Sequence, residues 1–204
     1  MIAPGTVYLV DDEPGMLKAL ARLLGAEGFT VRSFHSAAEF LAEPQPEGCL
    51  VLDVAMPGLD GMELQRRLTA GGSDLPVIFL TGHGDIPMSV RAIKSGAVDF
   101  LTKPVKDDDL IRAVGLALEL AAARAKERVG AARLRKLYSS LTPREREVMA
   151  HVIAGKPGKQ IAADLGTGEQ TIKIHRMRVM QKMEARSIVE LVRIAERLGV
   201  HQAG

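Results

Sequence analysis

The chain has little cysteine and no long apolar run, and each absence excludes a class of protein. Its 204 residues include one cysteine, Cys49, so no disulfide can form within the chain, which fits a reducing cytoplasm. No stretch reaches about eighteen apolar residues, so we expect no membrane span. Residues 1–6 lack a basic segment followed by an apolar one, and we expect no signal peptide.

Internal repeats and low-complexity segments are also absent, and the composition is that of an ordinary folded protein. Hydrophobic residues make up 47% and charged residues 25% of the chain, which excludes disordered and collagen-like classes.

The formal net charge of +2 hides a difference between the two halves of the chain. Residues 1–122 hold 10 Lys/Arg and 17 Asp/Glu, a net charge of −7, whereas residues 123–204 hold 17 and 8, a net charge of +9. This asymmetry predicts two domains with different partners. The basic half favours a polyanion such as nucleic acid, although a solvated basic surface explains the charge equally well.

The first half alternates short apolar runs with helical patterns. The predicted strands are 6–10, 29–34, 50–52, 76–80 and 98–101; the predicted helices are 14–28, 37–41, 61–70, 86–95 and one that begins at 107. This order is typical of an α/β doubly wound, five-stranded parallel sheet with both faces covered. Ligands of such sheets bind beyond the carboxyl ends of the strands.

Polar residues stand at several of these strand ends. Asp11 and Asp12 follow the first strand, Asp53 the third, Thr81 the fourth and Lys103 the fifth. Because parallel strands end at one edge, the three carboxylates, the hydroxyl and the ammonium should meet there. Crowded carboxylates of this kind suit Mg²⁺. A Mg²⁺ ion beside a carboxylate, a lysine and a threonine can support phosphoryl transfer.

Four segments of this half carry a resemblance to a known family. They are Val10-Asp11-Asp12-Glu13, Leu52-Asp53-Val54-Ala55-Met56-Pro57-Gly58-Leu59-Asp60-Gly61, Leu80-Thr81-Gly82-His83-Gly84-Asp85 and Gly96-Ala97-Val98-Asp99-Phe100-Leu101-Thr102-Lys103-Pro104. Residues 1–122 therefore resemble the receiver domain of bacterial two-component response regulators, a flavodoxin-like fold.

The resemblance implies a role for each matching residue. Asp53 would be the phosphoacceptor and Mg²⁺ the cofactor. Asp12 and Asp53 would bind the metal directly, Asp11 would bind it through water, and the backbone carbonyl of Ala55 would be a further ligand. Thr81 would bind the phosphoryl group, and Lys103 would pair with it. The Lys103–Pro104 peptide bond is expected to be cis. Phe100 stands where many members of the family carry a switch tyrosine, so a switch here would bury a ring without a hydroxyl contact.

The second half is predicted to be helical throughout. Residues 123–140 read as a solvated linker helix that Gly130 could interrupt. Thr142-Pro143-Arg144-Glu145 has the pattern of a capping box at the start of a helix. Further helices at 158–165, 169–183 and 187–199 follow, and the spacing of the first two is that of a helix-turn-helix, whose second helix enters the major groove.

Helical geometry assigns faces to the helix at 169–183. Ile172, Val179 and Met183 should face the core, and Arg176 should point partly inward. The candidate DNA contacts are Lys159, Thr171, Lys173, Ile174, Met177, Arg178 and Lys182. Among them, Lys173 could donate to guanine, while Ile174 and Met177 could contact a thymine methyl group. We expect phosphate contacts from Lys159, Arg178 and Lys182. Such contacts position the protein on DNA but do not specify the base sequence.

Residues 141–198 resemble the LuxR-type helix-turn-helix domain. The matching segments are Leu141-Thr142-Pro143-Arg144-Glu145-Arg146-Glu147-Val148, Lys159-Gln160-Ile161-Ala162 and Gln170-Thr171-Ile172-Lys173-Ile174-His175-Arg176. Together with the first half, they make the chain similar to response regulators of the NarL/FixJ type. Gly158 replaces a common Asn, and Thr167-Gly168 replaces a common Ile-Ser. The family's last helix, here 187–198, often forms a dimer on DNA.

These observations predict a phosphorylation-controlled, DNA-binding transcription regulator of a two-component system. Its domains would be a receiver at 1–122, a helical linker at 123–140 and a DNA-binding domain at 141–204. The expected partners are DNA, a sensor histidine kinase and a second copy of the chain on phosphorylation or DNA binding, in the cytoplasm and without a membrane. The protein would not be an enzyme, apart from slow autodephosphorylation of Asp53. Two alternatives stay open: a constitutive DNA-binding protein with a scaffold receiver, and a Mg²⁺-dependent aspartyl phosphohydrolase.

Overall fold

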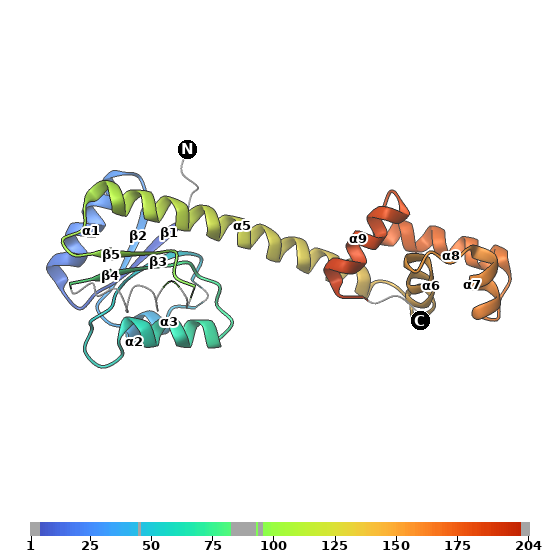
Figure 1. Cartoon of the computed structure of the whole chain (residues 1–204), viewed down its shortest axis with the longest axis horizontal. Coiled ribbons are helices and arrows are strands. Elements are labelled where there is room, and N and C mark those ends of the chain that lie inside the picture. The colour runs from blue at the N-terminus through green and yellow to red at the C-terminus, as the bar shows by residue number, and fades with distance from the viewer. Residues whose placement is uncertain (1–4, 45, 83–92, 94–95, 201–204) are drawn as a thin grey trace. The chain divides into compact units, whose positions relative to one another are not determined.

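The computed structural model describes residues 5–44, 46–82, 93 and 96–200, and its contacts divide the chain into two compact units. The first unit is Met1–Ala125 and the second is Lys126–Gly204 (Figure 1). Within the described residues, no helix is both long enough and apolar enough to cross a membrane.

The first unit is built on a five-stranded parallel sheet. Its elements are β1 (Thr6–Val10), α1 (Pro14–Ala26), β2 (Thr30–Phe34), α2 (Ala37–Leu41), β3 (Gly48–Asp53), α3 (Gly61–Ala70), β4 (Val77–Thr81), β5 (Asp99–Thr102) and the first part of α5 (Asp107–Ser139). The strand order is β2-β1-β3-β4-β5, and every pairing is parallel. This is the doubly wound α/β fold that the sequence predicts, with its switch in strand order between β1 and β3.

Alternation along the strands gives the sheet two apolar faces. Val7 and Leu9 of β1 pack with α1 and α5, whereas Tyr8 and Val10 pack with α2 and α3. Figure 1 shows α1 and α5 on one side of the sheet and α2 and α3 on the other. Cys49 lies fully buried in the first of these cores, and burial raises the pKa of its thiol to about 12.

The predicted elements of this unit agree with the described ones to within two residues. Helices α2 and α3 have the predicted bounds, and α5 begins at the predicted residue. The Lys103–Pro104 peptide is cis, as the resemblance implies. The helix expected at 86–95 falls almost wholly outside the described residues, as does His83.

The second unit is a cluster of short helices around one core. They are α6 (Pro143–Ile153), α7 (Gly158–Asp164), α8 (Glu169–Lys182) and α9 (Ile188–Leu198). Helix α6 begins with the predicted capping box: the Thr142 hydroxyl accepts from the Glu145 N–H, and the Glu145 carboxylate accepts from the Thr142 N–H. Gly168 occupies the N-cap position before α8 and provides no side-chain cap.

The linker region differs from the solvated helix that the sequence predicts. Helix α5 runs through Gly130 to Ser139, and Leu134, Leu137 and Tyr138 pack against the core of the second unit. Apolar residues on one face of these last turns explain the difference, because they gain stability by burial.

Polar contacts of α5 agree with the division near residue 125. Arg124 donates to the carbonyl of Asp74 in the first unit, and Arg133 pairs with Glu184 in the second. The last turns of α5 therefore belong structurally to the second unit.

Candidate functional site

Four strands of the first unit bring polar side chains to the same edge of the sheet. Asp11 follows β1, Asp53 ends β3, Thr81 ends β4 and Lys103 follows β5. Asp11, Asp53 and Thr81 are buried, with exposed fractions of 2%, 4% and 2%. The parallel register fixes this meeting, because it pairs β3 with β1 on one side and with β4 on the other.

Three carboxylates converge at this edge. One oxygen from each of Asp11, Asp12 and Asp53 lies within 4.8 Å of the others, and Asp12 is the exposed member. The structure thus brings together the acidic residues that the sequence singles out. Ala55, the source of the expected backbone carbonyl ligand, follows in the loop after β3.

The ammonium of Lys103 lies between the two buried carboxylates. Its Nζ is 2.7 Å from Oδ2 of Asp11 and 2.9 Å from Oδ1 of Asp53, with Oε1 of Glu13 at 3.7 Å. Partial burial by itself lowers the pKa of Lys103. The hydrogen bonds and charges of Asp11 and Asp53 outweigh that effect and raise the pKa above its ordinary value. The lysine is therefore held as a cation at this edge.

The donor set fits a hard divalent cation. Three carboxylates face one close ammonium, so the cluster keeps an excess of negative charge at a largely buried position. Carboxylate and carbonyl oxygens with an open, solvated side suit Mg²⁺, which keeps several waters of its own. Asp12 and the loop containing Ala55 provide that exposed side.

Thr81 and Phe100 lie on neighbouring strands. Register pairs Thr81 with Thr102 and Phe79 with Phe100, so alternation sends Thr81 and Phe100 to the same face of the sheet. The Phe100 ring is half-buried and tilted against Phe79, with 6.3 Å between ring centroids. The backbone N–H of Lys103 donates to the carbonyl of Thr81 at 2.7 Å, which ties the two strand ends together.

The second unit presents the face of α8 that the sequence predicts. Ile172, Val179 and Met183 are buried in the core as expected, with exposed fractions of 0%, 1% and 0%. The exposed candidates for DNA contact are Lys159 on α7 and Thr171, Lys173, Ile174, Met177 and Arg178 on α8.

Two basic residues of α8 lie against other parts of the second unit, and the half-burial of Arg176 agrees with its predicted, partly inward position. An open pocket of about 280 Å³ lies between the first turns of α7 and α8, and the half-buried Arg176 helps to line it beside Gly158. Lys182, expected at a DNA phosphate, places its Nζ 2.6 Å from Oε2 of Glu145, a contact that the sequence does not indicate. Glu145 is 2% exposed, and its capping-box pattern gave no sign of a second partner.

Comparison with known families agrees with both units. The family described as response regulator receiver domain matches residues 7–115, and the family described as bacterial regulatory proteins, luxR family, matches residues 139–195.

Individual relatives span nearly the whole chain. Nodulation protein W of Bradyrhizobium diazoefficiens is 46% identical over 95% of this chain and 86% of its own length. The transcriptional regulatory protein FixJ of the same organism is 45% identical over 98% of both chains. The solved structure of response regulator StyR is 45% identical, with a TM-score of 0.85 over 96% of this chain and 99% of that one. The chain therefore belongs to the two-component response regulators that join a receiver domain to a LuxR-type DNA-binding domain, and it is a phosphorylation-controlled transcription regulator.

Proposed function

We propose that Asp53 accepts a phosphoryl group from a sensor histidine kinase and that this event controls DNA binding by the second unit. The observation that carries the proposal is the position of Lys103, whose ammonium bridges Asp11 and Asp53. A buried carboxylate next to a fixed cation and two further carboxylates can accept an anionic phosphoryl group only where its added charge is offset.

The residues of the cluster divide the work of phosphoryl transfer. An oxygen of Asp53 forms a bond to phosphorus while the phosphorus–nitrogen bond to the kinase histidine breaks. Asp11, Asp12, Asp53 and the backbone carbonyl of Ala55 would hold Mg²⁺, which offsets charge on the phosphoryl oxygens. Lys103 would also offset charge on the phosphoryl group, and the Thr81 hydroxyl would donate to a phosphoryl oxygen.

The same residues suggest how the signal leaves the site. When Thr81 turns toward a phosphoryl oxygen, it changes the space available to Phe100 on the same face of the sheet. A deeper position of the half-buried ring would shift the population between two receiver states.

Substitution of Asp53 tests this proposal directly. Asp53→Asn should abolish acid-labile phosphate after incubation with Mg²⁺ and acetyl phosphate, as followed by the intact mass of the full chain. Glu47→Gln, a change of the same kind at an exposed site just before β3, should leave phosphorylation unchanged. Undiminished phosphate on the Asn variant would refute the assignment.

On the second unit, we propose that α8 reads bases, while α7 and one arginine of α8 contact the DNA backbone. Lys173, Ile174 and Met177 are exposed on α8 and would reach base edges, with Thr171 beside them. Lys159 and Arg178 would contact phosphates.

We also propose how two copies of the chain assemble and how the signal ends. Phosphorylation or DNA binding would pair two copies of the chain through α9, on which Ile188 is 44% and Val189 63% exposed. Residues 1–122 would act as the receiver and 141–204 as the DNA-binding domain, with 123–140 between them, in the cytoplasm. Slow autodephosphorylation of Asp53 would end the signal.

The two alternative functions are not favoured. Relatives that this chain matches over 86% or more of their length include proteins named as a response regulator and as a transcriptional regulatory protein. A scaffold receiver would have no use for the complete set of Asp11, Asp12, Asp53, Thr81 and Lys103.

A further inference from the structure

Glu145 is a carboxylate buried inside the second unit. Its side chain is 3% exposed, and Oε2 accepts from the Thr142 N–H at 2.9 Å and from Lys182 Nζ at 2.6 Å. A buried carboxylate without a cation is strongly destabilising. The ammonium of Lys182 is therefore committed to Glu145.

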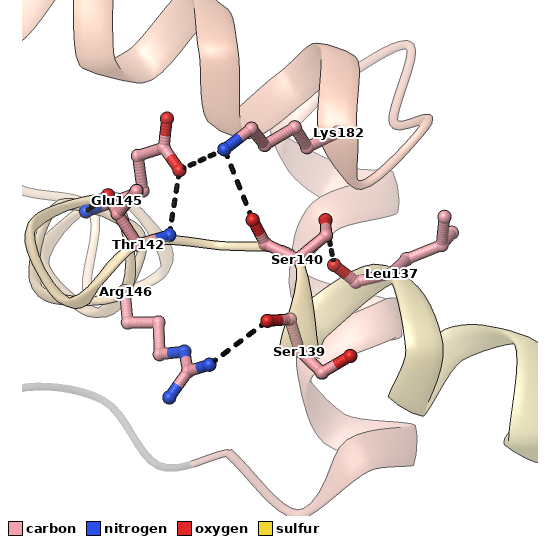
Figure 2. Close-up of polar contacts among 7 residues, drawn as sticks. All are labelled: Leu137, Ser139, Ser140, Thr142, Glu145, Arg146 and Lys182. Carbon is pink, nitrogen blue, oxygen red and sulfur yellow. Dashed lines mark hydrogen bonds and ion pairs between the residues drawn. The ribbon is translucent and has the colours of Figure 1, made fainter.

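The same ammonium reaches a third element. Lys182 Nζ also donates to the carbonyl of Ser140, at 3.1 Å, just beyond the end of α5 (Figure 2). The neighbouring carbonyl of Ser139 accepts from Arg146 at 3.3 Å. Carbonyls at a helix C-terminus lack partners within the helix, so these contacts satisfy them. One lysine thus joins the end of α5, the start of α6 and the end of α8.

Other contacts of α8 define its orientation less sharply. Ile172 and Val179 attach its inner face to the core by burial, which is not directional. Gly168 supplies no side-chain cap at its first turn. Among the residues that the structure describes, no other side chain of α8 hydrogen-bonds to another element. Charge-assisted hydrogen bonds, by contrast, are both strong and directional.

We propose that Lys182 is a positioning residue: by pairing with the buried Glu145 it fixes the C-terminal end of α8, and it sets the placement of the base-reading side chains without contacting a DNA phosphate. The inference rests on the proposed reading role of α8. The Lys182 ammonium also connects the end of α5 to the DNA-reading helix, so a displacement of either helix end would shift the other.

The experiment compares sequence preference with salt dependence in the full-length protein. The probe is a pool of random-sequence DNA duplexes, from which wild type selects a preferred site; affinities are then measured for that site and for a scrambled duplex over a range of salt. The variants are Lys182→Met, Lys182→Arg and Glu145→Gln. Lys159→Met is the control for loss of an exposed cation, and Glu147→Gln is the control for neutralising an exposed glutamate on α6.

The proposal predicts a specific pattern. Lys182→Met and Glu145→Gln should weaken binding to the selected site about tenfold, as the loss of one base contact would. Neither variant should weaken binding to the scrambled duplex or reduce the slope of log affinity against log salt. Lys182→Arg should restore the preference, and Glu147→Gln should match wild type. The Glu145 result is diagnostic, because a side chain 3% exposed cannot contact DNA.

A phosphate contact predicts the opposite pattern. Lys182→Met would then weaken binding to both duplexes and lower the salt slope by about 0.9, as expected for Lys159→Met. Glu145→Gln would change neither affinity nor slope. That outcome overturns the inference. If Lys182→Met does not fold, Lys182→Met/Glu145→Gln removes the unpaired buried charge and permits the same comparison. Failure of wild type to select any sequence would instead refute the proposed reading role of α8.

Discussion

At the scale of single residues, the position of Lys103 gives it two opposing effects. Its ammonium lies within 2.9 Å of oxygens on Asp11 and Asp53, which would also ligate Mg²⁺. It therefore competes with the metal for negative charge, and it also offsets the charge that a phosphoryl group adds.

Substitution of Lys103 should separate these two effects. We expect Lys103→Met to bind Mg²⁺ more tightly than wild type, because the carboxylates lose their internal cation, and to accumulate less phosphate from acetyl phosphate. Titration calorimetry and intact mass measure the two quantities. Lys106→Met, three residues away and exposed, serves as the control. Weaker Mg²⁺ binding in Lys103→Met would contradict this explanation.

Lys173 is the residue on α8 for which we expect a single-base effect. It is exposed beside Ile174, whereas Ile172 and Val179 on the same helix are buried. Lys173→Ala should relax preference at one base position at a cost of about 1–3 kcal/mol. Selection from random duplexes measures this change; a uniform loss of affinity for all sequences would instead identify Lys173 as a phosphate contact.

At the scale of elements, α8 begins with a weak cap. Gly168 has φ −78° and ψ 149°, a conformation open to any residue, and beyond the adjacent residues a Cβ there would have its nearest neighbour at 4.0 Å, on Thr171. Serine at this position could therefore accept a hydrogen bond from the first turn, as serine does at the starts of α2 and α9.

Two substitutions at Gly168 should change stability in opposite directions. We expect Gly168→Ser to stabilise the second unit by a few tenths of a kcal/mol and Gly168→Ala to destabilise it. The chain has no tryptophan and two tyrosines, so a Tyr8→Phe background leaves Tyr138, packed on the second unit's core, as the fluorescent reporter of urea unfolding. A Ser variant less stable than the Ala variant would contradict the capping argument.

The pair of Glu145 and Lys182 should make the second unit sensitive to acid. Burial by itself raises the pKa of Glu145, but the hydrogen bond and charge of Lys182, with the Thr142 contacts, bring the pKa below its ordinary value of 4.5. The unfolded chain then takes up this proton first, so the contribution is complete above about pH 4.5 and is lost as pH falls through the folded value.

The same fluorescent reporter measures this effect. In the Tyr8→Phe background, the free energy of unfolding should fall as pH drops below about 4.5. Glu145→Gln should flatten that dependence, whereas Glu147→Gln, which removes an exposed carboxylate, should retain it. An unchanged acid dependence in Glu145→Gln would show that other groups cause it.

Sequence patterns predicted the elements well because burial and periodicity are local. The apolar strand runs, the capping box at Thr142 and the inward side of α8 all follow from such spacing. The pairing of Lys182 with Glu145 does not follow from spacing. Spacing assigns a side chain to one face of a helix, but it does not show which other element packs against that face. The burial of Leu134, Leu137 and Tyr138 was missed for the same reason.

The acidic cluster was predicted more completely than the DNA-binding surface. Asp11, Asp53 and Lys103 meet because parallel strands end at one edge, so fold class alone determines their proximity. Residues on an exposed helix have no such constraint, and their roles depend on a partner that lies outside the chain.

At the scale of the whole molecule, the two halves carry charges of opposite sign. The net charge of +9 on residues 123–204 should make DNA affinity fall steeply with salt, because each neutralised phosphate releases counterions. The net charge of −7 on residues 1–122 becomes more negative on phosphorylation. An increase in DNA affinity on phosphorylation would therefore require a change of receiver state, since added negative charge alone would not favour DNA.

The most direct test is the affinity for the selected duplex before and after treatment with Mg²⁺ and acetyl phosphate, measured for wild type and Asp53→Asn. We predict that treatment raises the affinity of wild type and leaves that of Asp53→Asn unchanged, with both remaining sensitive to salt. Equal affinity of wild type with and without the phosphodonor would contradict control through Asp53 and would favour a receiver that serves only as a scaffold.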